Sequence, residues 1–196
     1  MPIDPRDEHR PTHRPIGATV SPDHERQTMD TDTLRGQRRR LLHIYLNDHL
    51  TGSAGAIELA RRCQRSNRDT PLGAFLVDLL REIGDDRKSL EDLMARLHMP
   101  ADRLKLAAAT VAEKLARLKL NGQILGYSDL SRVIELEALC GGVAVKRRLW
   151  QTLEQIHDVD PVLAEYDFTH LAERATAQLD ALERHRQAAA ARAFTP

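Results

Sequence analysis

The sequence predicts an all-α protein with four long helices in a bundle and one shorter helix in a crossover between two helical hairpins. Apolar residues recur at steps of three and four over most of residues 34–190, which is the spacing of a helix face. No stretch alternates apolar and polar residues over the length of a strand. Pro71, Pro100 and Pro161 stand where helices are expected to begin.

Length and charge limit the classes of function. The chain has 196 residues, which fits one domain with tails, and its 29 Lys and Arg balance its 29 Asp and Glu. A neutral chain lacks the strong positive field of a general nucleic-acid or anionic-membrane binder. We therefore expect neither a nucleic acid nor a membrane as partner.

The cysteines and the first residues indicate a cytoplasmic protein. Cys63 and Cys140 lie far apart and form no metal-binding or redox pair, so we expect buried free thiols in a reducing compartment. The first ten residues lack the apolar stretch of a signal peptide, and no apolar run approaches the roughly 20 residues that span a bilayer.

The N-terminal region is predicted to be a disordered tail. Residues 1–33 contain sparse apolar residues and many prolines among polar and charged ones: Pro2, Pro5, Pro11, Pro15 and Pro22. Residues 34–190 then form the helical domain, and residues 191–196 a short C-terminal tail.

The first predicted hairpin consists of two long helices. One runs from about Thr33 to Ser66, and its small residues from Gly52 to Gly55 would let another helix approach closely. The next has Thr70 as its N-cap and Pro71 at its first position. Its polar stretch 84–88 could break it, but Ile83 and Leu90 are one heptad apart, so we expect one helix to about His98.

The second half of the domain contains the crossover helix and a second hairpin. The crossover helix covers about Asp102 to Leu120. Ser128 caps a long helix whose expected inner stripe includes Leu130, Ile134, Glu137, Gly141, Val145 and Leu149. The pair Gly141 and Gly142 favours close helix packing over nucleotide binding. Asp167 caps the last helix, after a break at 158–161.

Three strings of residues resemble a group of bacterial proteins with a ferritin-like helical bundle: Tyr45-Leu-Asn-Asp-His-Leu50, Leu118-Lys-Leu-Asn-Gly122 and Ser131-Arg-Val-Ile-Glu-Leu-Glu137. The resemblance covers residues 41–186. It implies a four-helix bundle, often dimeric, which in active members holds two metal ions between Glu residues and Glu-x-x-His motifs. The chain departs from that pattern, since Glu82 is followed by Asp85 instead of His. We therefore expect a binding or structural protein without a complete di-iron centre, and no enzyme.

Polar residues on the apolar stripes define a candidate site. The residues are Asp48, His49, Glu82, Asp86 and Glu137. If a metal is held, they are the predicted ligands for Fe, Mn or Zn, with Asp48 orienting the others. Two alternatives need no metal. The acids could form a buried polar network, or Glu82 and Asp86 could lie at the edge of their stripe and pair with Arg81 or Arg87.

Two other classes of function remain open. Residues 89–120 can be read as a helix-turn-helix DNA-binding unit with a basic second helix, and this interpretation requires a loop at 84–88. The basic cluster at Arg35 and 38–40 could contact an acidic partner, although a solvated helix end explains it equally well. A purely structural protein would instead leave a helix face exposed for dimerisation.

Overall fold

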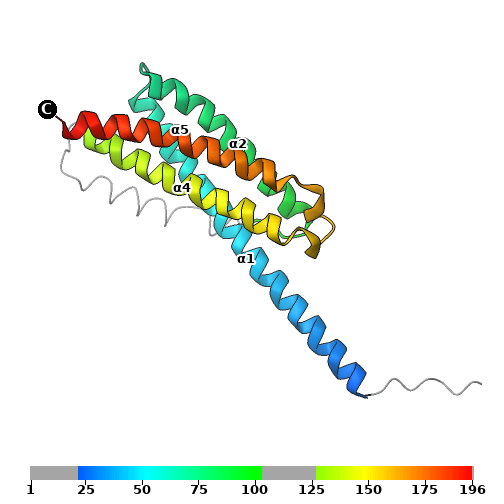
Figure 1. Ribbon diagram of the computed structural model, residues 1–196. Helices are drawn as coiled ribbons and strands as arrows, with labels where there is room; N and C mark the ends of the chain where they lie inside the picture. The colour runs from blue at the N-terminus through cyan, green and yellow to red at the C-terminus, as the bar shows by residue number, and fades with distance from the viewer. Residues whose placement is uncertain (1–21, 103–126, 196) are drawn as a thin grey trace, which may run out of the picture. The chain divides into compact units, whose positions relative to one another are not determined.

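The computed structural model describes the backbone of residues 22–102 and 127–195, with side chains from residue 33 onward. The elements are α1 (Pro22–Ser66), α2 (Pro71–Arg96), α4 (Asp129–Gln155), the short 3-10 turns η1 (His157–Val159) and η2 (Leu163–Glu165), and α5 (Phe168–Phe194) (Figure 1). Within these ranges no strand occurs, so the predicted all-α class is confirmed. The predicted crossover helix lies outside the described residues, apart from Asp102.

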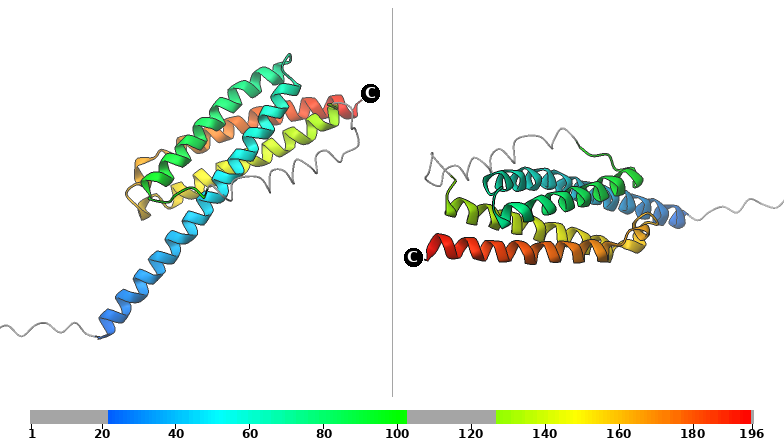
Figure 2. Two further views of the ribbon diagram at one scale, coloured as in Figure 1. Left: turned by 180° about the vertical axis from the view of Figure 1, so that it is seen from behind. Right: turned by 90° about the horizontal axis from the view of Figure 1, so that it is seen from above.

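Two compact units divide the chain, residues 1–40 and residues 41–196. The hydrophobic core and the candidate site lie in the second unit. In it, residues 41–66 of α1 pair with α2, and α4 pairs with α5, to give two helical hairpins laid one over the other (Figure 2).

Both ends of the helical region differ from the sequence prediction. Helix α1 begins at Pro22, well before Thr33, because Pro22 suits a first helical position and no proline follows until Pro71. Helix α5 continues to Phe194, whereas the sequence predicts a C-terminal tail over residues 191–196. An alanine-rich end favours the helix, and Ala189 is buried.

The predicted helix starts are confirmed by their capping hydrogen bonds. The hydroxyl of Thr70 accepts from the backbone N–H of Gly73, that of Ser128 from Ser131, and the carboxylate of Asp167 from His170. Each cap satisfies a backbone donor that has no partner within its helix.

Helix α2 is continuous through residues 84–88, as the heptad from Ile83 to Leu90 predicts. Its buried face includes Leu79, Ile83, Leu90 and Leu93. This continuity favours a bundle over the helix-turn-helix interpretation, which needed a loop there.

The core lies between the two hairpins, and α4 and α5 pack closely along their length. Trp150 stacks on Phe168 with ring centroids 6.2 Å apart, at the end where η1 and η2 join these helices. The predicted inner stripe of α4 is wrong in part: Leu130, Glu137 and Val145 are exposed, while Glu135 is buried. Apolar residues occur on two neighbouring faces of α4, so the periodicity alone could not select between them.

Candidate functional site

A buried ion-pair cluster joins three helices near the middle of the bundle. The carboxylate of Asp86, on α2, is 2% exposed and contacts the Lys146 ammonium of α4 and the Arg174 guanidinium of α5. An unpaired buried carboxylate is very unfavourable, and these two cations neutralise it.

Gln178 of α5 extends the cluster to a second acid. Its side-chain oxygen accepts from Lys146, and its Nε2 donates to Glu82 Oε2 at 2.8 Å. The amide thus turns its carbonyl toward the cation and its NH₂ toward the carboxylate. Burial lowers the pKa of Lys146, and the neighbouring Asp86 carboxylate opposes that effect.

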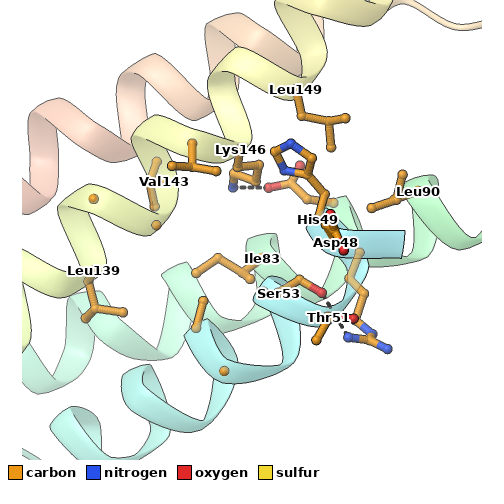
Figure 3. Close-up of a pocket in the computed structure, with 18 of the residues that line it drawn as sticks. Asp48, His49, Thr51, Ser53, Ile83, Leu90, Leu139, Val143, Lys146 and Leu149 are labelled. Atoms are coloured by element: carbon orange, nitrogen blue, oxygen red, sulfur yellow. Dashed lines mark hydrogen bonds and ion pairs between the residues drawn. The ribbon is translucent and has the colours of Figure 1, made fainter. Parts of the chain in front are cut away.

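A cavity of about 900 Å³ lies beside this cluster, between α1, α2 and α4 (Figure 3). Its walls are mainly apolar, and Ile83, Leu139 and Val143 are among the lining residues. Lys146 lines the cavity from α4, one to two turns beyond Val143 and Leu139. The volume falls within the usual range for small-molecule sites, about 300–1,000 Å³.

The small residues of α1 and α4 create this cavity. A Cβ atom built on Gly52 or Gly141 would meet no atom within 4 Å, and one on Gly142 would lie 3.9 Å from the Cβ of Ala56. The expectation that these small residues let two helices approach closely is confirmed at Gly142, beside Ala56, and is wrong at Gly52 and Gly141. At Gly52 and Gly141 the missing side chains leave a hollow between the helices.

Polar side chains on the α1 side of the cavity, such as those of His49 and Ser53, already contact other residues of the protein. His49 packs edge-on against Tyr45, with ring centroids 4.5 Å apart, and burial lowers its pKa. Arg87 of α2 donates to the backbone oxygen of Leu50 and to Ser53 Oγ at 2.8 Å. These bonds fix α1 against α2 along one edge of the cavity.

Two buried nitrogen atoms near the cavity lack an acceptor. Trp150 is 1% exposed and lines the cavity, and its indole Nε1 has no acceptor within residues 33–102 and 127–195. The Nε atom of Arg174, in the neighbouring ion-pair cluster, is unpaired in the same way. A buried donor without an acceptor is costly, and both nitrogens are closed to solvent and to the open space of the cavity.

The structure separates the five predicted site residues. Asp48, His49 and Asp86 line the cavity, Glu82 reaches the ion-pair cluster through Gln178, and the Glu137 side chain is 55% exposed near Arg186. In the described part of the chain, no group of three His, Cys, Asp or Glu residues is arranged to hold a metal ion. Asp86 and Glu82 form the buried polar network that was the alternative to a metal site.

Lys146, Arg174, Gln178 and Trp150 were not predicted from the sequence. A signal for Lys146 exists in the heptads of the core. Lys146 lies midway between the buried Leu139 and Leu153, as Asp86 does between Leu79 and Leu93. Each of these two helices therefore has one charged residue at a central core position. Because the two charges have opposite signs, the pattern indicates that Lys146 and Asp86 meet.

A second polar cluster lies nearer the α1–α2 turn. Glu135, which is 1% exposed, accepts from Arg62 Nε at 2.6 Å and from the Tyr127 hydroxyl at 2.9 Å. Asn67 donates to the Tyr127 hydroxyl at 3.0 Å and accepts from Arg132 Nε at 2.7 Å. Because its members satisfy one another, this cluster holds the hairpins together and offers no unpaired group.

The chain was compared with protein-family models, with curated proteins and with solved structures, and none matches it. Among the described helices, none combines the length and the apolar character that crossing a membrane requires.

Proposed function

We propose that this protein is a non-catalytic binding protein whose helical bundle holds a small apolar molecule in the cavity between α1, α2 and α4. The cavity itself carries the proposal, because small residues on α1 and α4 leave about 900 Å³ open between α1, α2 and α4. Protein interiors are normally filled to the density of organic crystals, so an apolar hollow of this size favours a ligand.

The proposal includes a ferritin-like architecture in which an ion-pair cluster takes the place of a di-iron centre. Two helical hairpins joined by a long connection support the architecture. At the middle of the bundle, the cations of Lys146 and Arg174 neutralise Asp86. Both cysteines are free thiols, which supports a reducing cytoplasmic setting.

The test uses Trp150 as a reporter, since it is the only tryptophan of the chain and it lines the cavity. Its fluorescence is followed while decan-1-ol, a neutral apolar probe, is titrated into the full-length protein. We expect a saturable change in the intensity or wavelength of the emission. A linear, non-saturating response would contradict binding in the cavity.

Two matched variants locate the probe. Gly141→Leu places a side chain in the hollow, so the affinity for decan-1-ol should fall at least about tenfold. Gly84→Leu adds the same side chain to α2, where a Cβ also has open space but does not line the cavity. Its affinity should remain that of the wild type. Equal affinities in all three proteins would place the probe elsewhere and overturn the proposal.

We also propose a homodimer formed through α1. Leu41 and Ile44 lie about one turn apart on this helix and are 59% and 48% exposed. Light scattering coupled to size-exclusion chromatography should give twice the chain mass for the wild type and the monomer mass for Leu41→Glu. A monomeric wild type would exclude this part of the proposal.

A further inference from the structure

We propose that the cavity holds a metal-bearing apolar macrocycle of the porphyrin class, with the imidazole of His49 as the protein ligand to the metal. This inference rests on the proposed function and narrows it from any apolar molecule to one with an open coordination position on a metal. A free imidazole in the cavity wall, the lack of other protein ligands around it and the length of the opening between α1 and α4 support it.

The imidazole of His49 is available to bind a metal. It lines the cavity from α1, on the side where Leu149 of α4 lies (Figure 3). Within residues 33–102 and 127–195, neither ring nitrogen forms a hydrogen bond, and unlike Nε1 of Trp150 they are not closed to solvent. Burial lowers the pKa of the ring, so a nitrogen lone pair is free near neutral pH.

The surroundings of His49 do not supply the ligands of a bare metal ion. In the described part of the chain, no group of three His, Cys, Asp or Glu residues could hold one. Both oxygens of Asp86, the buried acid of the cavity, contact the cations of Lys146 and Arg174. A metal held by one imidazole must therefore bring its other ligands with it. A porphyrin does so, because its ring nitrogens surround the metal and leave an axial position for histidine.

The opening between α1 and α4 is long enough for such a ring. Two contacts between these helices bound it. At one end the Tyr45 hydroxyl donates to Thr152 Oγ1 at 3.4 Å, and at the other a Cβ on Gly142 would lie 3.9 Å from the Cβ of Ala56. Tyr45 and Ala56 are 11 residues apart, which is about 16 Å along the axis of α1. This span exceeds the width of a porphyrin core.

The walls beside His49 suit the apolar faces of a macrocycle. Gly52 lies one helical turn from His49, and a Cβ there would meet no atom within 4 Å, so the space next to the imidazole is open. Ile83 and Leu90 of α2 line the cavity and belong to the core. The cavity volume of about 900 Å³ is near the upper end of the usual range for ligand sites, which favours a ring system over a single alkyl chain.

The charges of the cavity wall do not oppose a neutral ring. The two cations of the ion-pair cluster, Lys146 and Arg174, are matched by the carboxylates of Asp86 and Glu82. Asp48 lines the cavity and is exposed, so water screens its charge.

The experiment compares haemin with protoporphyrin IX, which is the same macrocycle without the iron. Both are titrated into the full-length protein at about pH 8, above the ordinary pKa of histidine. Quenching of the Trp150 fluorescence measures the two affinities, and a shift of the Soret absorption band of haemin reports the bond between iron and imidazole. We expect saturable binding of both, with haemin at least about tenfold tighter because the iron–imidazole bond forms only there.

Three variants assign the bond to His49 and the ring to the cavity. His49→Ala should lose the Soret shift and bind haemin about tenfold more weakly, while its affinity for protoporphyrin IX stays unchanged. Free imidazole added to this variant should restore the shift. His157→Ala removes an exposed imidazole outside the cavity and should behave as the wild type. Gly141→Leu, which fills the hollow, should weaken the binding of both macrocycles.

The outcomes separate this inference from the proposed function. A full Soret shift in His49→Ala, or equal affinities of the wild type for the two macrocycles, would overturn the role of His49 as metal ligand. If neither macrocycle binds while decan-1-ol does, the inference is wrong and the apolar binding protein remains. If decan-1-ol also fails to bind, the proposed function is overturned as well.

Discussion

Asp86 of α2 and Lys146 of α4 form an ion pair inside the bundle, and the second oxygen of the same carboxylate contacts Arg174 of α5. The side chain of Asp86 is 2% exposed, so the pair is shielded from solvent. Since each charge would be strongly disfavoured alone, the cluster requires these three helix faces to meet.

The first prediction concerns the stability of this cluster. Asp86→Ala leaves Lys146 and Arg174 without their shared carboxylate, so the free energy of unfolding should fall by about 3–5 kcal/mol. Urea denaturation followed by circular dichroism measures the change. The neighbouring Asp85 is 43% exposed, and Asp85→Ala should cost at most about 1 kcal/mol. Similar losses of unfolding free energy in the two variants would show that the buried ion pair stabilises the fold no more than an exposed one.

Glycines in α1 and α2 should respond to alanine in opposite ways. Gly52 has open space around it, so Gly52→Ala should raise the free energy of unfolding by about 0.5–1 kcal/mol through helix propensity. A Cβ on Gly73 would lie 2.0 Å from the backbone oxygen of Asn67, so Gly73→Ala should lower the melting temperature. A destabilised Gly52→Ala would mean that the hollow beside α1 is filled.

Acidic pH should destabilise the fold partly through His49. Burial lowers its pKa in the folded state below the ordinary 6.5, so the unfolded chain binds the proton more readily. Its contribution to stability is therefore complete above about pH 6.5 and is lost as the pH falls toward the lowered pKa. The prediction is a decline in the free energy of unfolding between about pH 7.5 and 5.5, with a smaller slope in His49→Gln.

The same pH series needs a control for other histidines. Burial also lowers the pKa of His185, which stacks on Phe75, so His185→Gln should reduce the slope as well. His157 is on the surface, and its pKa is raised by a hydrogen bond to the backbone oxygen of Glu154. His157→Gln should not reduce the slope. A His49→Gln protein with the wild-type slope would refute the assignment.

Thiol chemistry should distinguish the two cysteines. Cys63 is fully buried, and this burial, with the Glu135 charge nearby, raises the pKa of its thiol to about 12. Only thiolates react with iodoacetamide at an appreciable rate, and Cys140 is the more exposed residue. Mass spectrometry should therefore find Cys140 labelled first.

A single-cysteine variant makes the thiol test decisive. In Cys140→Ser, Cys63 should resist iodoacetamide in buffer and react once the chain is unfolded in urea. Equal labelling rates in the two conditions would show that Cys63 is freely accessible in the native protein.

Much of the fold could be predicted from the sequence because its signals are local. A cap such as Thr70 bonds to Gly73, three residues away, and the same holds for Ser128 and Asp167. The continuity of α2 through residues 84–88 could be predicted because Ile83 and Leu90 are one heptad apart. The candidate site was predicted only in part: Asp48, His49 and Asp86 line the cavity, but Glu137 is on the outside of α4.

By itself, then, the sequence determined the helices α2, α4 and α5 with their capped starts, and the acidic character of one core position in α2. Tertiary structure alone decided which face of α4 is buried, that Lys146, 60 residues from Asp86, is its partner, and that the glycines border a cavity. The physical reason is the range of the interactions. Caps and helical periodicity act within a few residues, whereas burial, ion pairing across helices and empty volume depend on how separate helices come together.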